Sequence, residues 1–324
     1  MAIPIQAQLL WKALSRVSNT ALFQLPADQV RAAADRRRAI IGLPGASLVV
    51  GRPHPDVFTT QKKTDGVPVR VYRPSDALDE RLPLVMNFHG GGFVSGDPQQ
   101  SEWWCSSIAH GVRAVVVSVD YRLAPEHPFP TAAEDCHQAS RWAVSHAADL
   151  GADGTRVAVM GDSAGGNLAA VVGLMARDRG APSFAFQLLL YPIVDLVNSY
   201  PSEDENEFAP FLGKADLHGH ELYCPGQEAE PYASPLFADH AGLPPAFIQT
   251  ANHDPLRDQG AAYADALRAA GVPVRLTNYV DAVHGYISVP GVVPAARQAL
   301  AEAVTALRAA LAQAPDFREQ NALE

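Results

Sequence analysis

Apolar residues along most of this chain alternate between two patterns. Short, nearly continuous apolar runs predict buried strands, and between them lie stretches in which apolar residues recur at helical spacing. The predicted strands are 84–88, 114–119, 156–160, 184–191, 245–253 and 274–279, and the clearest predicted helices are 131–146 and 296–311. Strands that alternate with helices favour a mainly parallel sheet with helices on both faces. The sequence therefore predicts an α/β fold.

The beginning of the chain follows a different pattern. Residues 1–45 carry two stretches of helical spacing, and the second, 28–41, is predicted to stop at Gly42. Both stretches lie before the first strand, so they are not part of the alternation that builds the sheet. Residues 46–76 predict strands. Pro68 marks the start of the clearest one, because proline within a sheet is confined to edges and strand starts.

A serine between two glycines is the most informative local pattern. Ser163 stands between Gly161 and Gly165, directly after the strand 156–160 and before a helical stretch of small residues. A strand that turns abruptly into a helix holds its central residue in a strained backbone conformation. This geometry exposes the serine hydroxyl as a nucleophile. The pattern also occurs by chance in glycine-rich proteins, so its interpretation depends on other segments.

Three consecutive glycines follow the strand 84–88, in the segment 89–93. Backbone N–H groups can converge on one point in such a loop, as the oxyanion of an acyl-transfer intermediate requires. A phosphate-binding loop is the competing interpretation, but no Lys-Ser or Lys-Thr pair follows and the spacing of a dinucleotide fingerprint is missing. A plain glycine turn is the structural alternative.

An acidic residue and a histidine follow two later strands. Asp254 comes directly after the strand 245–253, and His284 comes shortly after the strand 274–279. Ligands bind beyond the carboxyl ends of the strands in open parallel sheets. The chain order Ser163, Asp254, His284 is the order of the α/β-hydrolase arrangement.

Neighbouring residues offer alternatives for both roles. Asp258 is more typical of the first turn of the next helix, where a carboxylate interacts favourably with the helix dipole. Asp281 lies too close to His284 along the chain for the usual geometry between two loops. His253 is the nearest competing histidine, but its side chain and that of the adjacent Asp254 point apart in most loop geometries. The pattern therefore favours Asp254 and His284.

Together these segments resemble the hormone-sensitive-lipase-like serine esterases, the bacterial family IV carboxylesterases. The matching segments are 89–93, 119–130, 161–166, 232–236, 254–258 and 284–285. The resemblance implies an α/β-hydrolase fold with a mostly parallel central sheet and a helical cap. It also implies hydrolysis of uncharged esters with short to medium acyl chains. Tyr286 stands where the family usually has phenylalanine, and Gln259 where glutamate is common. A tyrosine at this position is expected to alter the polarity of the pocket.

Elementary chemistry gives each predicted site residue a role. The hydroxyl of Ser163 is a weak nucleophile at neutral pH, so it requires a base. The imidazole of His284 can take its proton and later donate it to the leaving alcohol. Asp254 is expected to hold the imidazole in the correct tautomer and to stabilise the imidazolium.

The backbone is expected to supply the oxyanion donors. These are the N–H groups of Ala164, Gly91 and Gly92, with Gly90 as the alternative. Two polar neighbours, Asp162 beside the nucleophile and His89 before the glycines, are predicted to brace the turn and the loop through hydrogen bonds.

The stretch 194–227 interrupts the alternation of strands and helices. It contains an acidic cluster, followed by Phe208, Phe211 and Leu212. We predict an insertion that packs with residues 1–45 to form a cap over Ser163, with an apolar pocket for the acyl chain. A surface excursion without contact to the site is the alternative. The expected domains are 1–45 (N-terminal cap helices), 46–193 with 228–324 (catalytic domain), and 194–227 (cap insertion).

Composition fits one large core with a small accessory element, since the chain has 324 residues of which 48% are hydrophobic. The net charge of −10 disfavours a nucleic-acid partner. The three cysteines are far apart, which argues against a disulfide framework, and they lack ligand-like spacing, so we expect neither a metal nor another cofactor. No apolar stretch approaches the ~20 residues of a membrane span, and no signal-peptide pattern is present. The cytoplasm is the expected location.

These observations predict a serine carboxylesterase that acts on a small-molecule ester through an acyl-enzyme. One alternative is a catalytically silent ligand-binding protein on the same fold, which would be expected to lack part of the triad. Another is an amidase or lactonase, because the same triad serves related acyl transfers. The resemblance further implies a homodimer formed through an edge strand.

Overall fold

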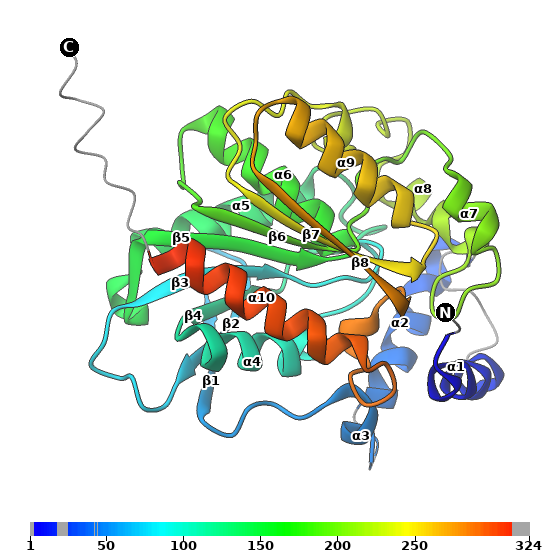
Figure 1. Cartoon of the computed structure of the whole chain (residues 1–324), viewed down its shortest axis with the longest axis horizontal. Helices are drawn as coiled ribbons and strands as arrows, with labels where there is room; N and C mark the ends of the chain where they lie inside the picture. The colour runs from blue at the N-terminus through cyan, green and yellow to red at the C-terminus, as the bar shows by residue number, and fades with distance from the viewer. Residues whose placement is uncertain (1–2, 18–24, 42, 44, 313–324) are drawn as a thin grey trace.

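The computed structural model describes residues 3–17, 25–41, 43 and 45–312. A central sheet carries helices on both of its faces (Figure 1). Its strands are β1 (Val57–Lys63), β2 (Pro68–Pro74), β3 (Leu82–Phe88), β4 (Val115–Val119), β5 (Ala152–Asp162), β6 (Phe186–Leu190), β7 (Ala246–His253) and β8 (Val274–Val283). The α-helices are α1 (Ile5–Val17), α2 (Ala27–Ile41), α3 (Ser47–Val50), α4 (Glu102–Val112), α5 (Thr131–Ser145), α6 (Ala164–Arg179), α7 (Pro201–Glu205), α8 (His220–Tyr223), α9 (Arg257–Ala269) and α10 (Ala295–Ala312).

The eight strands are arranged in the order β1-β2-β4-β3-β5-β6-β7-β8. Pairing is antiparallel between β1 and β2 and between β2 and β4, and parallel between all the other neighbours. The parallel strands β3 to β8 therefore end at one common edge. This architecture confirms the prediction of a mainly parallel sheet.

The core lies on both sides of the sheet, which explains the continuous apolar runs of the central strands. Every residue of β3, β4 and β6 is buried, as expected for strands covered on both faces. Helices α4 and α10 cover one face, and α5, α6 and α9 cover the other (Figure 1). None of the helices in the described part of the chain is long and apolar enough to span a membrane.

One predicted stretch differs from the structure. Residues 46–76 are not all extended, because Ser47–Val50 forms the short helix α3 and the first strand begins only at Val57. The backbone of Val49 accepts a hydrogen bond from Gly291, so this turn docks beside the start of α10 instead of joining the sheet. Pro68 does begin a strand, as predicted. The predicted helix stop at Gly42 lies outside the described residues.

Residues 194–227 form an irregular segment that includes α7 and α8. In Figure 1 these two helices lie with α1 and α2 at the same side of the molecule, next to the carboxyl ends of β7 and β8. The ring of Trp11, from α1, packs against Phe211 with the ring centroids 5.5 Å apart. The N-terminal region and the segment 194–227 are therefore in direct contact.

Candidate active site

Ser163 occupies a tight turn between β5 and α6. Its backbone has φ 55° and ψ −118°, outside the regions that non-glycine residues normally adopt. The N–H of Ser163 donates to the carbonyl of Leu190 at 2.9 Å, which fixes the turn against β6. A Cβ at Gly165 would overlap the carbonyl oxygen of Phe88, so only glycine allows this close approach of helix and strand. The turn has the strained geometry that the sequence predicts.

A chain of two hydrogen bonds joins Ser163, His284 and Asp254. The Nε2 atom of His284 lies 2.9 Å from the Oγ of Ser163, and its Nδ1 lies 2.8 Å from the Oδ2 of Asp254. An ionised carboxylate only accepts hydrogen bonds, so Nδ1 carries the proton and Nε2 is free to accept from the serine hydroxyl. Asp254 is fully buried, and its Oδ1 accepts from the N–H of Leu256 at 2.8 Å.

These three residues come from the carboxyl ends of three parallel strands. Ser163 follows β5, Asp254 follows β7 and His284 follows β8. The alternative residues lie elsewhere: Asp258 is in the first turn of α9, and Asp281 lies within β8. The structure therefore brings together the residues that the sequence favours.

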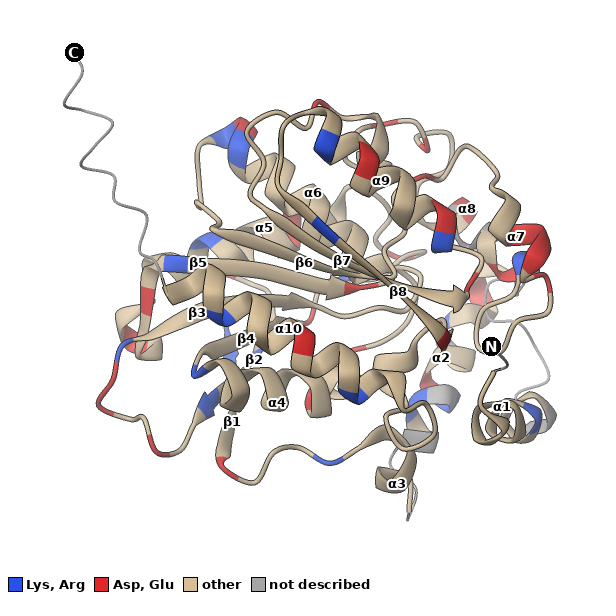
Figure 2. Ribbon diagram, in the orientation of Figure 1, with Lys and Arg blue, Asp and Glu red and all other residues tan. Residues whose placement is uncertain are grey.

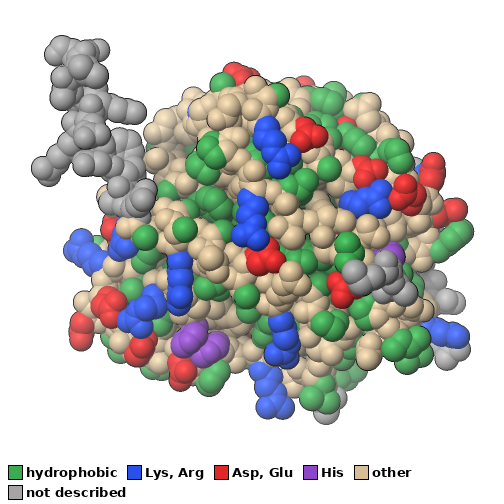
Figure 3. Space-filling model, viewed as in Figure 1, with side chains coloured by type: hydrophobic (Ala, Val, Ile, Leu, Met, Phe, Trp, Pro, Cys, Tyr) green, Lys and Arg blue, Asp and Glu red, His purple; other side chains and the backbone are tan. Residues whose placement is uncertain are grey.

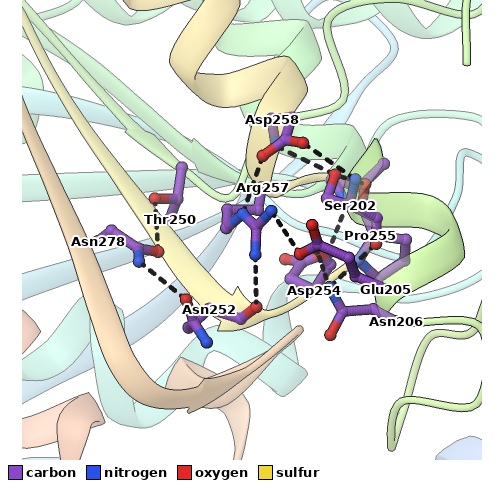
Figure 4. Close-up of polar contacts among 11 residues, drawn as sticks. Ser202, Glu205, Asn206, Thr250, Asn252, Asp254, Pro255, Arg257, Asp258 and Asn278 are labelled. Carbon is purple, nitrogen blue, oxygen red and sulfur yellow. Dashed lines mark hydrogen bonds and ion pairs between the residues drawn. The ribbon is translucent and has the colours of Figure 1, made fainter. Parts of the chain in front are cut away.

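The loop that carries Asp254 is fastened to α7 (Figure 4). Ser202 donates its hydroxyl to the carbonyl of Pro255 at 2.7 Å and its N–H to Asp258 at 2.9 Å. Arg257 pairs with Glu205 at 2.8 Å. These partners are about fifty residues apart along the chain, and no local motif announces them. The contacts tie the segment 194–227 to the acid of the site.

The glycine loop faces the serine. The N–H of Gly90 donates to the carboxylate of Asp162 at 3.0 Å and is therefore occupied. The N–H groups of Gly91, Gly92 and Ala164 have no hydrogen-bond acceptor within the described residues. Gly91 has φ 128°, which strongly favours glycine. Of the four residues expected as oxyanion donors, three thus carry an N–H that is available to a ligand.

Asp162 contacts the glycine loop and is buried. Desolvation raises the pKa of its carboxyl to about 6, although the hydrogen bond from Gly90 opposes this shift. The hydroxyl of Tyr191 lies 3.4 Å from the same carboxylate, and its ring meets the ring of His284 edge-on with centroids 4.8 Å apart. Tyr191 thus packs against both residues. It belongs to no sequence motif, so the sequence contains no sign of this role.

His89 also braces the glycine loop. Its Nδ1 lies 2.9 Å from the carbonyl of Gly90, and its ring stacks on Tyr121 with centroids 4.2 Å apart. Burial lowers the pKa of this imidazole to about 4. The ring is therefore neutral near pH 7, and its Nδ1–H donates to the carbonyl.

A cavity of about 380 Å³ opens above Ser163. Its apolar walls come largely from the segment 194–227. These residues are Leu196, Val197, Phe211, Leu212 and Leu217. Gln259 also lines the cavity and accepts the N–H of Val194 at 3.2 Å, which holds the start of that segment. Tyr286 does not line it, because its hydroxyl donates to Gln249 at 3.0 Å inside the core. The expected effect of Tyr286 on the polarity of the pocket is therefore not seen.

One group of side chains in the described residues has the composition of a metal site, namely His54, Asp56 and His110. None of the three lines the cavity above Ser163. The two imidazoles are stacked, with centroids 3.7 Å apart and an interplanar angle of 15°. Nitrogen lone pairs lie in the plane of the ring, so two stacked rings do not direct them at one ion. As arranged here, the group does not fit a metal.

The chain is similar in sequence to known esterases. The family described as alpha/beta hydrolase fold matches residues 85–288. The chain is 47% identical to carboxylesterase NlhH of Mycobacterium tuberculosis over 252 residues, which cover 76% of this chain and 79% of that protein. It is 44% identical to esterase LipI of the same organism over 276 residues, or 80% and 84% of the two chains.

Solved structures agree with the sequence relatives. A thermostable esterase from Pseudomonas putida superimposes with a TM-score of 0.85 at 34% identity, covering 96% of this chain and 98% of that one. A hyperthermophilic esterase from the archaeon Pyrobaculum calidifontis gives a TM-score of 0.85 at 37% identity, covering 95% and 99%.

Proposed function

Because this chain belongs to the hormone-sensitive-lipase-like (family IV) carboxylesterases of the α/β-hydrolase fold, we propose that Ser163, His284 and Asp254 carry out its reaction. The chain is a carboxylic ester hydrolase, and the predictions of fold and activity are confirmed. The observation that carries the proposal is the continuous hydrogen-bonded path from the serine hydroxyl through the imidazole to the buried carboxylate.

Acylation begins at the serine. The Oγ of Ser163 attacks the ester carbonyl carbon while its proton passes to Nε2 of His284, and the carbonyl π electrons move to the oxygen. The N–H groups of Gly91, Gly92 and Ala164 are the donors we propose for this oxyanion. When the intermediate collapses, the bond to the alcohol oxygen breaks and His284 returns the proton to the leaving alcohol. The product of this half-reaction is an ester of Ser163.

Deacylation repeats these steps with water. His284 removes a proton from a water molecule, whose oxygen attacks the acyl carbon, and the same donors hold the second oxyanion. The imidazolium then protonates Oγ as the acyl bond to Ser163 breaks. Asp254 stabilises the imidazolium in both halves, because its carboxylate faces the proton on Nδ1.

We propose that residues 1–45 and 194–227 form a cap on a catalytic domain made of 46–193 and 228–324. The contact between Trp11 and Phe211 and the apolar side chains of 194–227 on the cavity wall support this division. A cavity of about 380 Å³ with such walls suits short to medium acyl chains.

We also propose a cytoplasmic homodimer. In the described residues β8 pairs only with β7, so its outer edge offers free backbone groups to a second copy. Light scattering of the purified protein tests the dimer directly, and a monomer at micromolar concentration would refute it.

The test of the nucleophile is Ser163→Ala with Ser145→Ala as its control, since Ser145 is exposed and does not line the cavity. We expect Ser163→Ala to lower kcat for a p-nitrophenyl ester by about 10⁶-fold without a change in the thermal melting curve. A fluorophosphonate should label Ser163, which mass spectrometry of the peptides would show. Full activity of Ser163→Ala, or labelling at another residue, would refute the assignment.

A further inference from the structure

Acidic side chains form much of the polar wall of the cavity above Ser163. Asp162, Asp195, Glu203 and Asp216 line it, and Lys214 is the single lysine or arginine among the described lining residues. Figure 2 shows acidic residues concentrated on α7, and Figure 3 shows acidic side chains gathered at the same side of the molecular surface. The cavity is therefore lined by charges of predominantly one sign.

Neutral donors hold these carboxylates in place. Asp195 accepts the N–H groups of Val197 and Asn198, the side-chain amide of Asn198 and the hydroxyl of Tyr200, at 2.7 to 3.0 Å. Hydrogen bonds from neutral groups orient the carboxylate of Asp195 but bring no opposite charge to it.

Glu203 and Asp216 each accept a hydrogen bond from a backbone N–H. Glu203 accepts the N–H of Tyr200 at 3.1 Å, and Asp216 accepts the N–H of Gly213 at 3.0 Å. Neither forms an ion pair with a lysine or arginine of the described chain. Their charges are therefore not cancelled by a direct ion pair, although Glu203 contributes electrostatically to the raised pKa of Lys214.

The one lysine does not neutralise the wall. Lys214 forms an ion pair with Asp204, a residue outside the cavity lining. The neighbouring Glu205 and Asp258 are likewise offset by Arg257. The four carboxylates of the cavity wall therefore form no direct ion pair with a lysine or arginine of the described residues.

We propose that this acidic wall makes the enzyme select substrates by charge, favouring neutral and cationic esters and rejecting esters that carry a carboxylate or a phosphate. The inference rests on the proposed function, because it concerns the cavity above Ser163. A cleft lined by one sign of charge between low-dielectric walls focuses its field and changes the local concentration of a charged substrate. An anionic substrate must also bring its own charge next to carboxylates that cannot move away.

Matched esters on the purified full-length enzyme test the proposal. The acyl series carries a trimethylammonium, a carboxylate, or their neutral tert-butyl and isopropyl isosteres at the end of the same p-nitrophenyl ester chain. The alcohol series compares acetylcholine with its neutral tert-butyl isostere, 3,3-dimethylbutyl acetate. We expect kcat/KM of the carboxylate ester to be at least about tenfold below that of its isostere at low salt. We also expect kcat/KM of the cationic ester to be higher than that of its neutral isostere in at least one series.

Added salt and charge-removing variants distinguish the effect of the cavity wall from the effect of the net charge of the protein. In about 1 M sodium chloride, where the screening length is about 3 Å, both ratios should move towards one. The double variant Glu203→Gln with Asp216→Asn keeps both hydrogen-bond acceptors and should shrink the discrimination about threefold or more. The control Asp79→Asn with Asp149→Asn makes the same change in net charge at exposed residues outside the cavity lining and should leave it unchanged.

The outcomes distinguish this inference from the proposed function. Rapid turnover of the neutral esters, with equal kcat/KM for all charge states in both series, would overturn charge selection and leave the Ser163 mechanism intact. If both double variants reduced the discrimination equally, the discrimination would come from net charge, and the proposed role of the acidic wall would be overturned. Loss of neutral-ester turnover in wild type would instead refute the proposed function.

Discussion

The carboxylate of Asp162 accepts a hydrogen bond from the backbone N–H of Gly90 across 3.0 Å. Asp162, which precedes the proposed nucleophile Ser163, therefore holds the glycine loop at Gly90, directly before Gly91 and Gly92. Because the carboxylate engages the N–H of Gly90, that group is not available to an oxyanion. Gly91 and Gly92 remain the donors that we propose.

The burial of Asp162 predicts a pH-dependent contribution of this residue to stability. Burial raises the pKa of its carboxyl from 3.8 to about 6, so the folded protein holds this proton more tightly than the unfolded chain. The stabilising contribution is complete below about pH 4 and is lost as the pH rises through about 6. The shift corresponds to about 3 kcal/mol.

Urea denaturation of wild type and Asp162→Asn between pH 4 and 8 measures this effect. We expect the free energy of unfolding of wild type, relative to the variant, to fall as the pH rises towards 7. A difference that is constant over this range would show that Asp162 has an ordinary pKa in the folded protein.

A second prediction compares two aspartates four residues apart. Asp254→Asn should lower kcat by about 10⁴-fold, because an amide cannot stabilise the imidazolium and favours the wrong tautomer. Asp258→Asn makes the same chemical change on a residue that bonds to Ser202 and Arg257. Steady-state kinetics should show little loss of kcat for Asp258→Asn. Equal losses in the two variants would contradict the assignment of the acid.

Two glycines of α6 provide a third prediction. Gly165→Ala places a methyl group on the carbonyl oxygen of Phe88 and should destabilise the protein by about 3 kcal/mol. Gly173→Ala meets only the Oε1 of Gln187, at 4.0 Å, and should stabilise the helix by about 0.5–1 kcal/mol. Thermal melting of both variants measures the contrast. If Gly165→Ala melted at the temperature of wild type, α6 and β3 would not be in contact at this position.

The fourth prediction concerns the proposed cap. Phe211→Ala removes a ring from the cavity wall and should shift the preferred acyl chain towards longer esters. Each additional buried methylene contributes about 0.8 kcal/mol, or about fourfold in kcat/KM. Phe208→Ala is the matched control, because Phe208 is 86% exposed in the same segment and does not line the cavity. If the two variants had the same chain-length profile, the segment would not shape the acyl pocket.

Much of the site was predictable because its parts are local. The turn at Ser163 and the glycine loop each occupy a few consecutive residues, and Asp254 and His284 are recognisable by their positions after strands. The supporting contacts were not predictable in this way. Tyr191 packs against His284, and Ser202 binds Pro255, only because distant segments meet in the fold.

The beginning of the chain shows a different limit of sequence analysis. Leu48, Val49 and Val50 are consecutive apolar residues, which favours a strand, yet they belong to the short helix α3. A helix of four residues is too short to display its own period. The carbonyl of Val49 accepts a hydrogen bond from the N–H of Gly291, and a single sequence contains no sign of that distant partner.

The close approach of Gly165 to Phe88 links the nucleophile to the glycine loop, since Phe88 ends the strand from which that loop departs. The nucleophile and the glycine loop therefore follow the neighbouring strands β5 and β3. The acid and the base follow β7 and β8, on the other side of β6. Distortion of the sheet at β6 would separate Ser163 from His284 and interrupt proton transfer, while the oxyanion donors would stay beside Ser163.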